Sequence, residues 1–165
     1  MMSREREVRF PPEVGPIDHP SIFLAGPIQG TWDWQSEATR LIHDQDPHII
    51  VLNPRRPHID ETFDFGKQVD WETHHLAEAG HNGSIMFWLA RETEHICWER
   101  AYAQTSRFEL AEWLMAQELS YYHPSVVLGI EEGFPGARYI RHRTKGPYFA
   151  TLEETCEAAV VEARR

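Results

Sequence analysis

Four short apolar runs constrain the fold of this chain more than any other feature of its sequence. They cover residues 21–26, 49–52, 84–89 and 125–129, and each is flanked by glycine, proline or polar residues. Such runs are typical of strands covered on both faces. Apolar residues at helical spacing predict helices over about 34–44, 67–79, 108–120 and 151–163. This alternation predicts an α/β fold with a doubly wound parallel sheet of about five strands and helices on both faces, with 137–141 as a short fifth strand.

The chain is expected to form one domain after an N-terminal arm. Residues 1–20 are rich in proline and glycine and contain no apolar segment like that of a signal peptide, so we expect a flexible arm. Residues 21–165 are enough for a single hydrophobic core. They are therefore expected to fold as one unit.

The net charge and the cysteines indicate which partners and which compartment to expect. The net charge of −10 argues against nucleic acid or an anionic membrane as a partner, since both require a basic face. No apolar run approaches the roughly 20 residues of a membrane span. Cys97 and Cys156 occur without an export signal, which is typical of reduced thiols. We therefore expect a cytoplasmic protein.

Several common motifs of cofactor binding and of catalysis are absent from the sequence. There is no GxxxxGK[ST] phosphate loop, no GxGxxG dinucleotide motif and no GxSxG nucleophile turn. The ten histidines include no HExxH motif, and the adjacent His74 and His75 point to different sides of a helix. Neither a cofactor nor a metal ion is expected.

The site is expected at the carboxyl ends of the first three strands, where connecting loops converge. These loops contain Gly26, Pro27 and Ile28 after the first strand and Asn53, Arg55 and Arg56 after the second, and the third leads to Glu109. Thr105 and Ser106 are expected to cap the helix and place Glu109 in its first turn, where the macrodipole stabilises an anion. Glu109 would then be available as a nucleophile. The alternative is a capping-box glutamate with no chemistry.

Glu109 has two candidate carboxylate partners. Glu72 lies on the helix before the third strand, and Asp64 lies in the loop before that helix. A pair of carboxylates beside aromatic walls suits glycosidic-bond chemistry, in which one group attacks the anomeric carbon and the other handles protons at the leaving group. The alternative for Glu72 is a solvated helical pair with His75.

Four blocks of sequence together carry a resemblance to a known family. The blocks are Ser21–Pro27, Gln68–Glu72 with Leu76, Ile85–Trp88 and Thr105–Trp113. In this order the chain resembles the nucleoside 2-deoxyribosyltransferase-like family over roughly residues 21–141. The resemblance implies a flavodoxin-like fold, dimers or higher oligomers, Glu109 as the nucleophile and Glu72 as the group that hydrogen-bonds or protonates the base.

The resulting expectation is cleavage of the N-glycosidic bond of a (deoxy)nucleoside or its monophosphate through a glycosyl–Glu109 intermediate. Transfer to another nucleobase would make a deoxyribosyltransferase, and transfer to water a hydrolase. We expect Trp88 or Trp32 to stack on the base and Asn53, Arg55 and Arg56 to bind sugar hydroxyls or a phosphate. Asp64, Thr105 and Trp113 complete the expected site. The alternatives are a non-catalytic nucleotide-sensing module and an oligomeric scaffold in which tryptophans anchor the interface.

The C-terminal tail predicts self-association. Residues 147–165 carry several apolar side chains, and Tyr121, Tyr122 and Tyr148 form an aromatic group nearby. A symmetric partner would cover this apolar surface. We expect a homodimer or a higher oligomer.

Overall fold

The computed structural model describes residues 5–96 and 98–165, so Cys97 lies outside the described residues. Within them the chain forms one five-stranded, all-parallel sheet in the order β1-β3-β2-β4-β5. The strands are β1 Val8–Arg9, β2 Ser21–Ala25, β3 Ile50–Leu52, β4 Gly83–Leu89 and β5 Val126–Ile130. In the central register, Phe23 pairs with Leu52 on one side and with Ile85 on the other.

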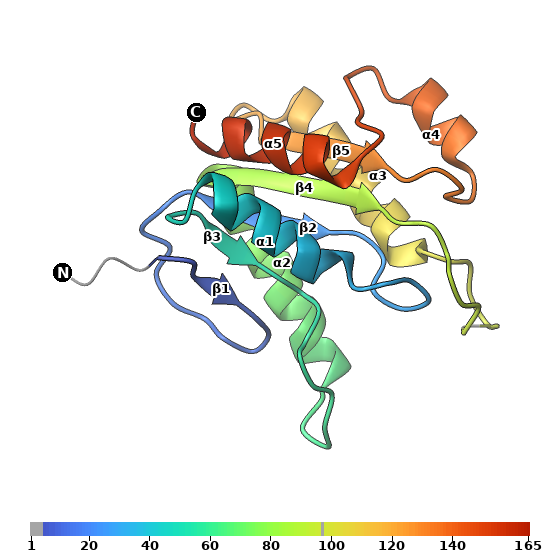
Figure 1. Cartoon of the computed structure of the whole chain (residues 1–165), viewed down its shortest axis with the longest axis horizontal. Coiled ribbons are helices and arrows are strands. Elements are labelled where there is room, and N and C mark those ends of the chain that lie inside the picture. The colour runs from blue at the N-terminus through green and yellow to red at the C-terminus, as the bar shows by residue number, and fades with distance from the viewer. Residues whose placement is uncertain (1–4, 97) are drawn as a thin grey trace.

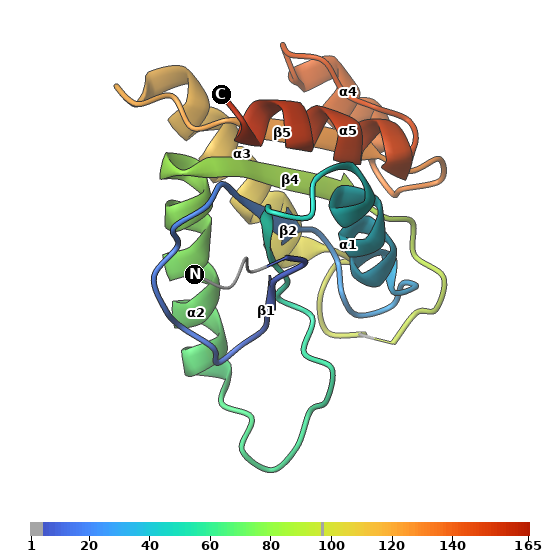
Figure 2. The same ribbon diagram turned by 60° about the vertical axis from the view of Figure 1, so that its left-hand side comes forward.

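Helices cover both faces of this sheet, which confirms the predicted doubly wound, flavodoxin-like α/β fold. Helices α1 and α5 pack on one face, and α2 and α3 pack on the other (Figures 1 and 2). The helices are α1 Trp34–Gln45, α2 Phe65–His81, α3 Gln104–Leu119, α4 Ala137–Arg143 and α5 Leu152–Ala163. In the described part of the chain, no helix combines the length and the apolar character needed to cross a membrane.

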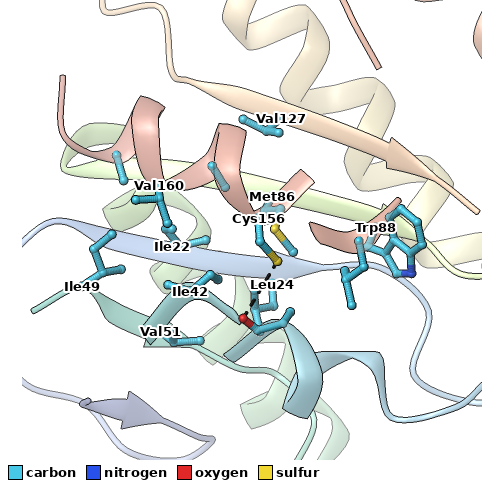
Figure 3. Packing of buried hydrophobic residues seen from close by; sticks show 14 of the residues in the cluster. Ile22, Leu24, Ile42, Ile49, Val51, Met86, Trp88, Val127, Cys156 and Val160 are labelled. Atoms are coloured by element: carbon cyan, nitrogen blue, oxygen red, sulfur yellow. Dashed lines mark hydrogen bonds between the residues drawn. The ribbon is translucent and has the colours of Figure 1, made fainter. Parts of the chain in front are cut away.

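The two faces of the sheet bury two separate apolar clusters. Side chains alternate between the faces along each strand, so Met86 and Trp88 join the cluster under α1 and α5, while Ile85 and Phe87 join the other. Figure 3 shows the first cluster, in which the Cys156 thiol lies 3.9 Å from the Ala38 carbonyl oxygen. Burial raises the pKa of this thiol to about 12.

The fifth strand differs from the one predicted. Residues 137–141 form helix α4, and the backbone of Phe149 occupies the edge beside β5 through hydrogen bonds with Leu128 and Ile130. The strand that was not predicted is β1, at the other edge of the sheet. It comes from the segment predicted to be a flexible arm. Arg9 fixes that segment, because its buried guanidinium binds Glu7 and the carbonyls of residues 15 and 16.

The starts of α1 and α5 agree with the sequence analysis, whereas α2 begins two residues earlier than predicted and α3 four residues earlier. Asp33 caps α1 and Thr151 caps α5. Helix α3 begins earlier than predicted, at Gln104, after Ala103 in a left-handed conformation with φ 55°. The predicted capping by Thr105 and Ser106 is therefore wrong, since both lie inside the first turn. Glu109 consequently lies one turn further along the helix than predicted.

The C-terminal tail contributes more to the core than predicted. Leu152, Cys156 and Val160 on α5 are buried against β2 and β4. Exposed aromatic surface remains at Tyr121, which is 93% exposed, and at Tyr148, which is 44% exposed.

Candidate active site

A cavity of about 360 Å³ opens at the carboxyl edge of the sheet. Strand β2 is followed by a connection to β3 on one side, and β3 is followed by a connection to β4 on the other side of β2. The chain therefore leaves a crevice at this topological switch point, where α/β folds bind ligands. The walls come from residues 25–30 after β2, residues 54–69 around the start of α2, and residues 92–106 before and within α3.

The cavity wall contains a glycine, Gly26, at a position where the backbone leaves no room for a side chain. Gly26 has φ +150°, and a Cβ atom there would lie 2.2 Å from the Trp88 carbonyl oxygen. The following carbonyl, that of Pro27, accepts a hydrogen bond of 2.8 Å from the Trp34 indole. Gly26, Pro27 and Ile28, which the sequence analysis placed in the expected site, line the cavity.

Two half-buried glutamates from different helices line this cavity. They are Glu72 on α2 and Glu109 on α3. Burial, then the charges of Glu72 and Glu112, raise the pKa of Glu109 to about 8. Burial also raises the pKa of Glu72, while a hydrogen bond from Gln68 acts in the opposite direction. The expected stabilisation of Glu109 as an anion is not found, because burial and the charge of Glu72 disfavour the anion and the residue lies beyond the first turn.

Gln68 is a site residue that the sequence analysis did not select. Its side-chain amide donates to Glu72 Oε1 at 2.7 Å and to the Pro54 carbonyl at 3.0 Å. Its carbonyl oxygen accepts a hydrogen bond of 2.8 Å from Arg56 Nε. The available signal was the spacing of four residues between Gln68 and Glu72, which places both side chains on one helix face.

Arg55 joins two of the loops that form the cavity. Its guanidinium donates to Gln35 Oε1 at 2.9 Å and to the carbonyls of Ile28 and Trp32 at 2.9 and 3.1 Å. It also forms an ion pair with Asp33 at 3.3 Å. The residue lines the cavity, but these donors are directed at the protein itself.

Asn53 and Asp64 have local backbone partners rather than positions in the cavity wall. Asn53 is 3% exposed, and its side-chain oxygen accepts from the Arg55 backbone N–H at 2.9 Å. Asp64 caps α2 by accepting from the Lys67 N–H at 2.9 Å. Both predicted ligand residues therefore shape the loop between β3 and α2, which extends away from the sheet in Figures 1 and 2.

None of the three tryptophans predicted for the site, Trp32, Trp88 and Trp113, lines the cavity. Trp88 is 2% exposed inside the cluster of Figure 3, on the face of the sheet opposite α2 and α3. Trp113 packs against Gly80 on α2, and the Trp32 indole approaches Glu131 at 3.4 Å. Thr105 does line the cavity, and the apolar walls are formed by Ile59, Phe63, Phe65, Val69 and Ile96.

The loop between β4 and α3 is tied to the rest of the site. The Tyr102 hydroxyl donates to the Ala90 carbonyl at 2.7 Å, and Thr93 N–H donates to the Gly30 carbonyl at 2.8 Å. Arg100, which also lines the cavity, donates to Gln29 Oε1 at 2.5 Å. Among residues 5–96 and 98–165, no three histidine, cysteine, aspartate or glutamate side chains gather in a way that could hold a metal ion.

Comparison with known proteins identifies the family of the chain. No curated protein matches the chain. The family model described as nucleoside 2-deoxyribosyltransferase like matches residues 19–115, which include all of β2, β3, β4 and α2 and the part of α3 that carries Glu109. This match spans more than half of the 165 residues. The chain therefore belongs to the nucleoside 2-deoxyribosyltransferase-like family.

Proposed function

We propose that this protein cleaves the N-glycosidic bond of a nucleoside, deoxynucleoside or nucleoside monophosphate through a glycosyl–Glu109 intermediate. The observation that carries this proposal is the pair of carboxyl groups, Glu72 and Glu109, on two helices around one cavity at the switch point of the sheet. Family membership supports the same substrate class. A pair of carboxyl groups is the equipment that displacement at an anomeric carbon requires.

In the proposed reaction, a Glu109 oxygen attacks C1′ of the sugar, the bond from C1′ to the base nitrogen breaks, and that nitrogen takes a proton from the carboxyl pair. Glu72 hydrogen-bonds the base. A second nucleobase or a water molecule then attacks C1′, returns a proton to the pair and releases Glu109, which gives transfer or hydrolysis respectively. Both steps need the sugar held between the two carboxyl groups, and α2 and α3 provide rigid supports for them.

The apolar part of the cavity supports a flat, uncharged group as one half of the substrate. Phe65 is 73% exposed and Ile96 is 50% exposed, although both line the cavity. Large apolar side chains held in water at the edge of a cavity gain free energy when a ligand covers them. We assign this part of the site to the nucleobase, in place of Trp88 and Trp32.

The test is incubation with a panel of nucleosides and 5′-monophosphates, with and without free acceptor bases, followed by chromatography for released or exchanged base. We expect Glu109→Gln to lose this activity by at least about a thousandfold, as loss of a covalent nucleophile does. The matched control is Glu112→Gln, three residues further along α3. Full activity of a folded Glu109→Gln variant would refute the proposal.

Mass spectrometry tests the intermediate directly. Wild-type protein mixed with a slow, fluorinated nucleoside is expected to gain the mass of the sugar on the peptide that contains Glu109. Turnover of the substrate with no adduct at any time would instead favour direct attack by water.

A second candidate function is ligand sensing without catalysis. The pKa of about 8 for Glu109 favours it, since most Glu109 side chains are then protonated, and less nucleophilic, at neutral pH in the empty site. Calorimetry separates the two functions. A sensing module binds a nucleoside or nucleotide and releases no base over hours.

A further inference from the structure

The hydrogen-bond chain from Arg56 through Gln68 to Glu72 determines how the Glu72 carboxyl group is presented to the cavity. An arginine side chain can only donate hydrogen bonds and a backbone carbonyl can only accept them. The contact with Arg56 Nε therefore fixes the Gln68 oxygen on the side of Arg56, and the contact with the Pro54 carbonyl fixes the amide nitrogen on the other side. The remaining N–H of that nitrogen points to Glu72 Oε1 at 2.7 Å.

The oxygen and both N–H groups of the Gln68 amide thus form hydrogen bonds. Rotation of the amide by 180° would break them. A fixed N–H donor favours the ionised form of the carboxyl group that it contacts. No hydrogen bond to the Glu109 carboxyl group occurs among the described residues, so Glu109 lacks this support. The charge of Glu72 raises the pKa of Glu109. Of two carboxyl groups that interact in this way, the one without a hydrogen-bond donor holds the proton.

We propose that Gln68 is a positioning residue that keeps Glu72 as the carboxylate of the pair, so that the shared proton rests on Glu109 and is the proton that leaves with the base. The transfer of the proton to the base rests on the proposed function. The location of the proton on Glu109 concerns the empty site alone.

The proposed distribution balances the glycosyl-transfer step without another acid. The O–H bond of Glu109 breaks and an ester bond forms between Glu109 and C1′. The bond from C1′ to the base nitrogen breaks, and its electron pair stays on that nitrogen, which takes the proton. This proton is the one that Glu109 gives up, and Glu72 remains the carboxylate that it was at the start. The raised pKa of Glu109 agrees with this resting state, and the chemistry needs no net proton uptake.

One further charged group acts on Glu109, and several charged residues line the cavity around the pair. Glu112 lies on the same helix as Glu109 and raises its pKa. The remaining charged residues in the cavity wall are Arg55 and Arg56 from the loop before α2, and Glu92, Glu94 and Arg100 from the loop before α3. Arg55 and Arg56 are directed at Gln35 and Gln68 respectively.

Carbon-13 NMR of protein labelled at the glutamate carboxyl carbons tests where the proton rests, with signals assigned from Glu72→Gln and Glu109→Gln. In wild type we expect the titration step near pH 8 to appear mainly on Glu109. In Gln68→Met, Glu72 should take a comparable share of that step. Gln104→Met is the control, because Gln104 lines the same cavity and should leave the distribution unchanged. A wild-type step that belongs to Glu72, or the same distribution in Gln68→Met, would overturn the proposal.

Arg56 gives a second, independent variant should Gln68→Met not fold. Arg56→Lys retains a donor to the Gln68 oxygen and is expected to keep the wild-type distribution. Arg56→Met frees the amide to turn and should resemble Gln68→Met. Equal titration of the two Arg56 variants would contradict the orienting role.

The pH profile of kcat/KM tests the use of the proton. Loss of the donor in Gln68→Met makes the pair hold its proton more tightly, so the alkaline limb of the profile should move to higher pH. If Gln68 had only a structural role, Gln68→Met would lower kcat/KM by the same factor at every pH. That result would refute the transfer of the Glu109 proton to the base. Absence of any base release by wild type would reject the proposed function, while the NMR result would still decide where the proton rests.

Discussion

Replacing Glu109 with glutamine is expected to make the protein more stable at neutral and alkaline pH. Burial and the charges of Glu72 and Glu112 raise the pKa of Glu109 from 4.5 to about 8 in the folded protein. Between these two pH values the folded protein keeps a proton that the unfolded chain has released. The free energy of unfolding therefore falls as the pH rises through this window.

The structure sets the size of this effect. One titrating group changes the free energy of unfolding by at most about 1.4 kcal/mol per pH unit, which gives an upper limit of roughly 5 kcal/mol across the window. Because Glu109 is only half-buried and solvent screens its charge, we expect about 2 to 3 kcal/mol. Glutamine carries no charge at any pH, so the variant should lack this loss.

Urea denaturation at pH 5, 6, 7 and 8 measures the difference directly. Wild type and Glu109→Gln should be similar at pH 5, and the variant should become progressively more stable as the pH rises. Glu112→Gln is the control and should keep most of the wild-type slope. Parallel pH dependences for wild type and Glu109→Gln would refute the reasoning, since they would mean that Glu109 ionises freely in the folded protein.

Gly26→Ala is expected to destabilise the protein by about 3 kcal/mol or more, because its Cβ would meet the Trp88 carbonyl at 2.2 Å; a thermal melt unchanged within error would contradict this. Arg55→Ala should reduce kcat/KM for a nucleoside and for its 5′-monophosphate by the same factor, since the guanidinium bonds internal acceptors; a tenfold change in their ratio would instead indicate a phosphate contact. The exposed apolar residues Met115 and Leu119 lie one turn apart on α3 and are expected to face a second copy of the chain. Light scattering should then show a dimer that Met115→Glu with Leu119→Glu converts to a monomer, and a wild-type monomer at micromolar concentration would exclude this interface.

The sequence was enough to predict four of the five strands in the described part of the chain and the edge of the sheet at which the cavity opens. The runs at β2, β3, β4 and β5 are apolar over nearly their whole length, so they form strands whichever helix covers them. Because the carboxyl ends of parallel strands meet at one edge, the loops after them had to converge there. Glu72 and Glu109 were therefore predicted to share a site from their places in the chain, and both line the cavity.

The orientation of individual side chains was not predictable in the same way. A strand that is apolar on both faces offers no polar residue to show which face is which, so the position of Trp88 under α5 could not be read from its neighbours in sequence. Strand β1 is only two residues long and forms through pairing with β3. Its local sequence carries no periodicity to detect.

The protonation of the carboxyl pair was decided by tertiary structure alone. Helix α3 by itself predicted an ionised Glu109, because a local analysis includes the helix dipole and omits everything that packs against the helix. In the folded protein the opposing influences are burial, which keeps water from the carboxyl group, and then the charge of Glu72, which α2 brings to the same cavity. The hydrogen bonds from Arg56 to Gln68 and from Gln68 to Glu72 also depend on the fold, because Arg56 lies in a loop and Gln68 lies on α2 twelve residues further along the chain. Electrostatic free energies depend on distance and burial in space, so the sequence determines which groups are present while the fold determines which of them holds the proton.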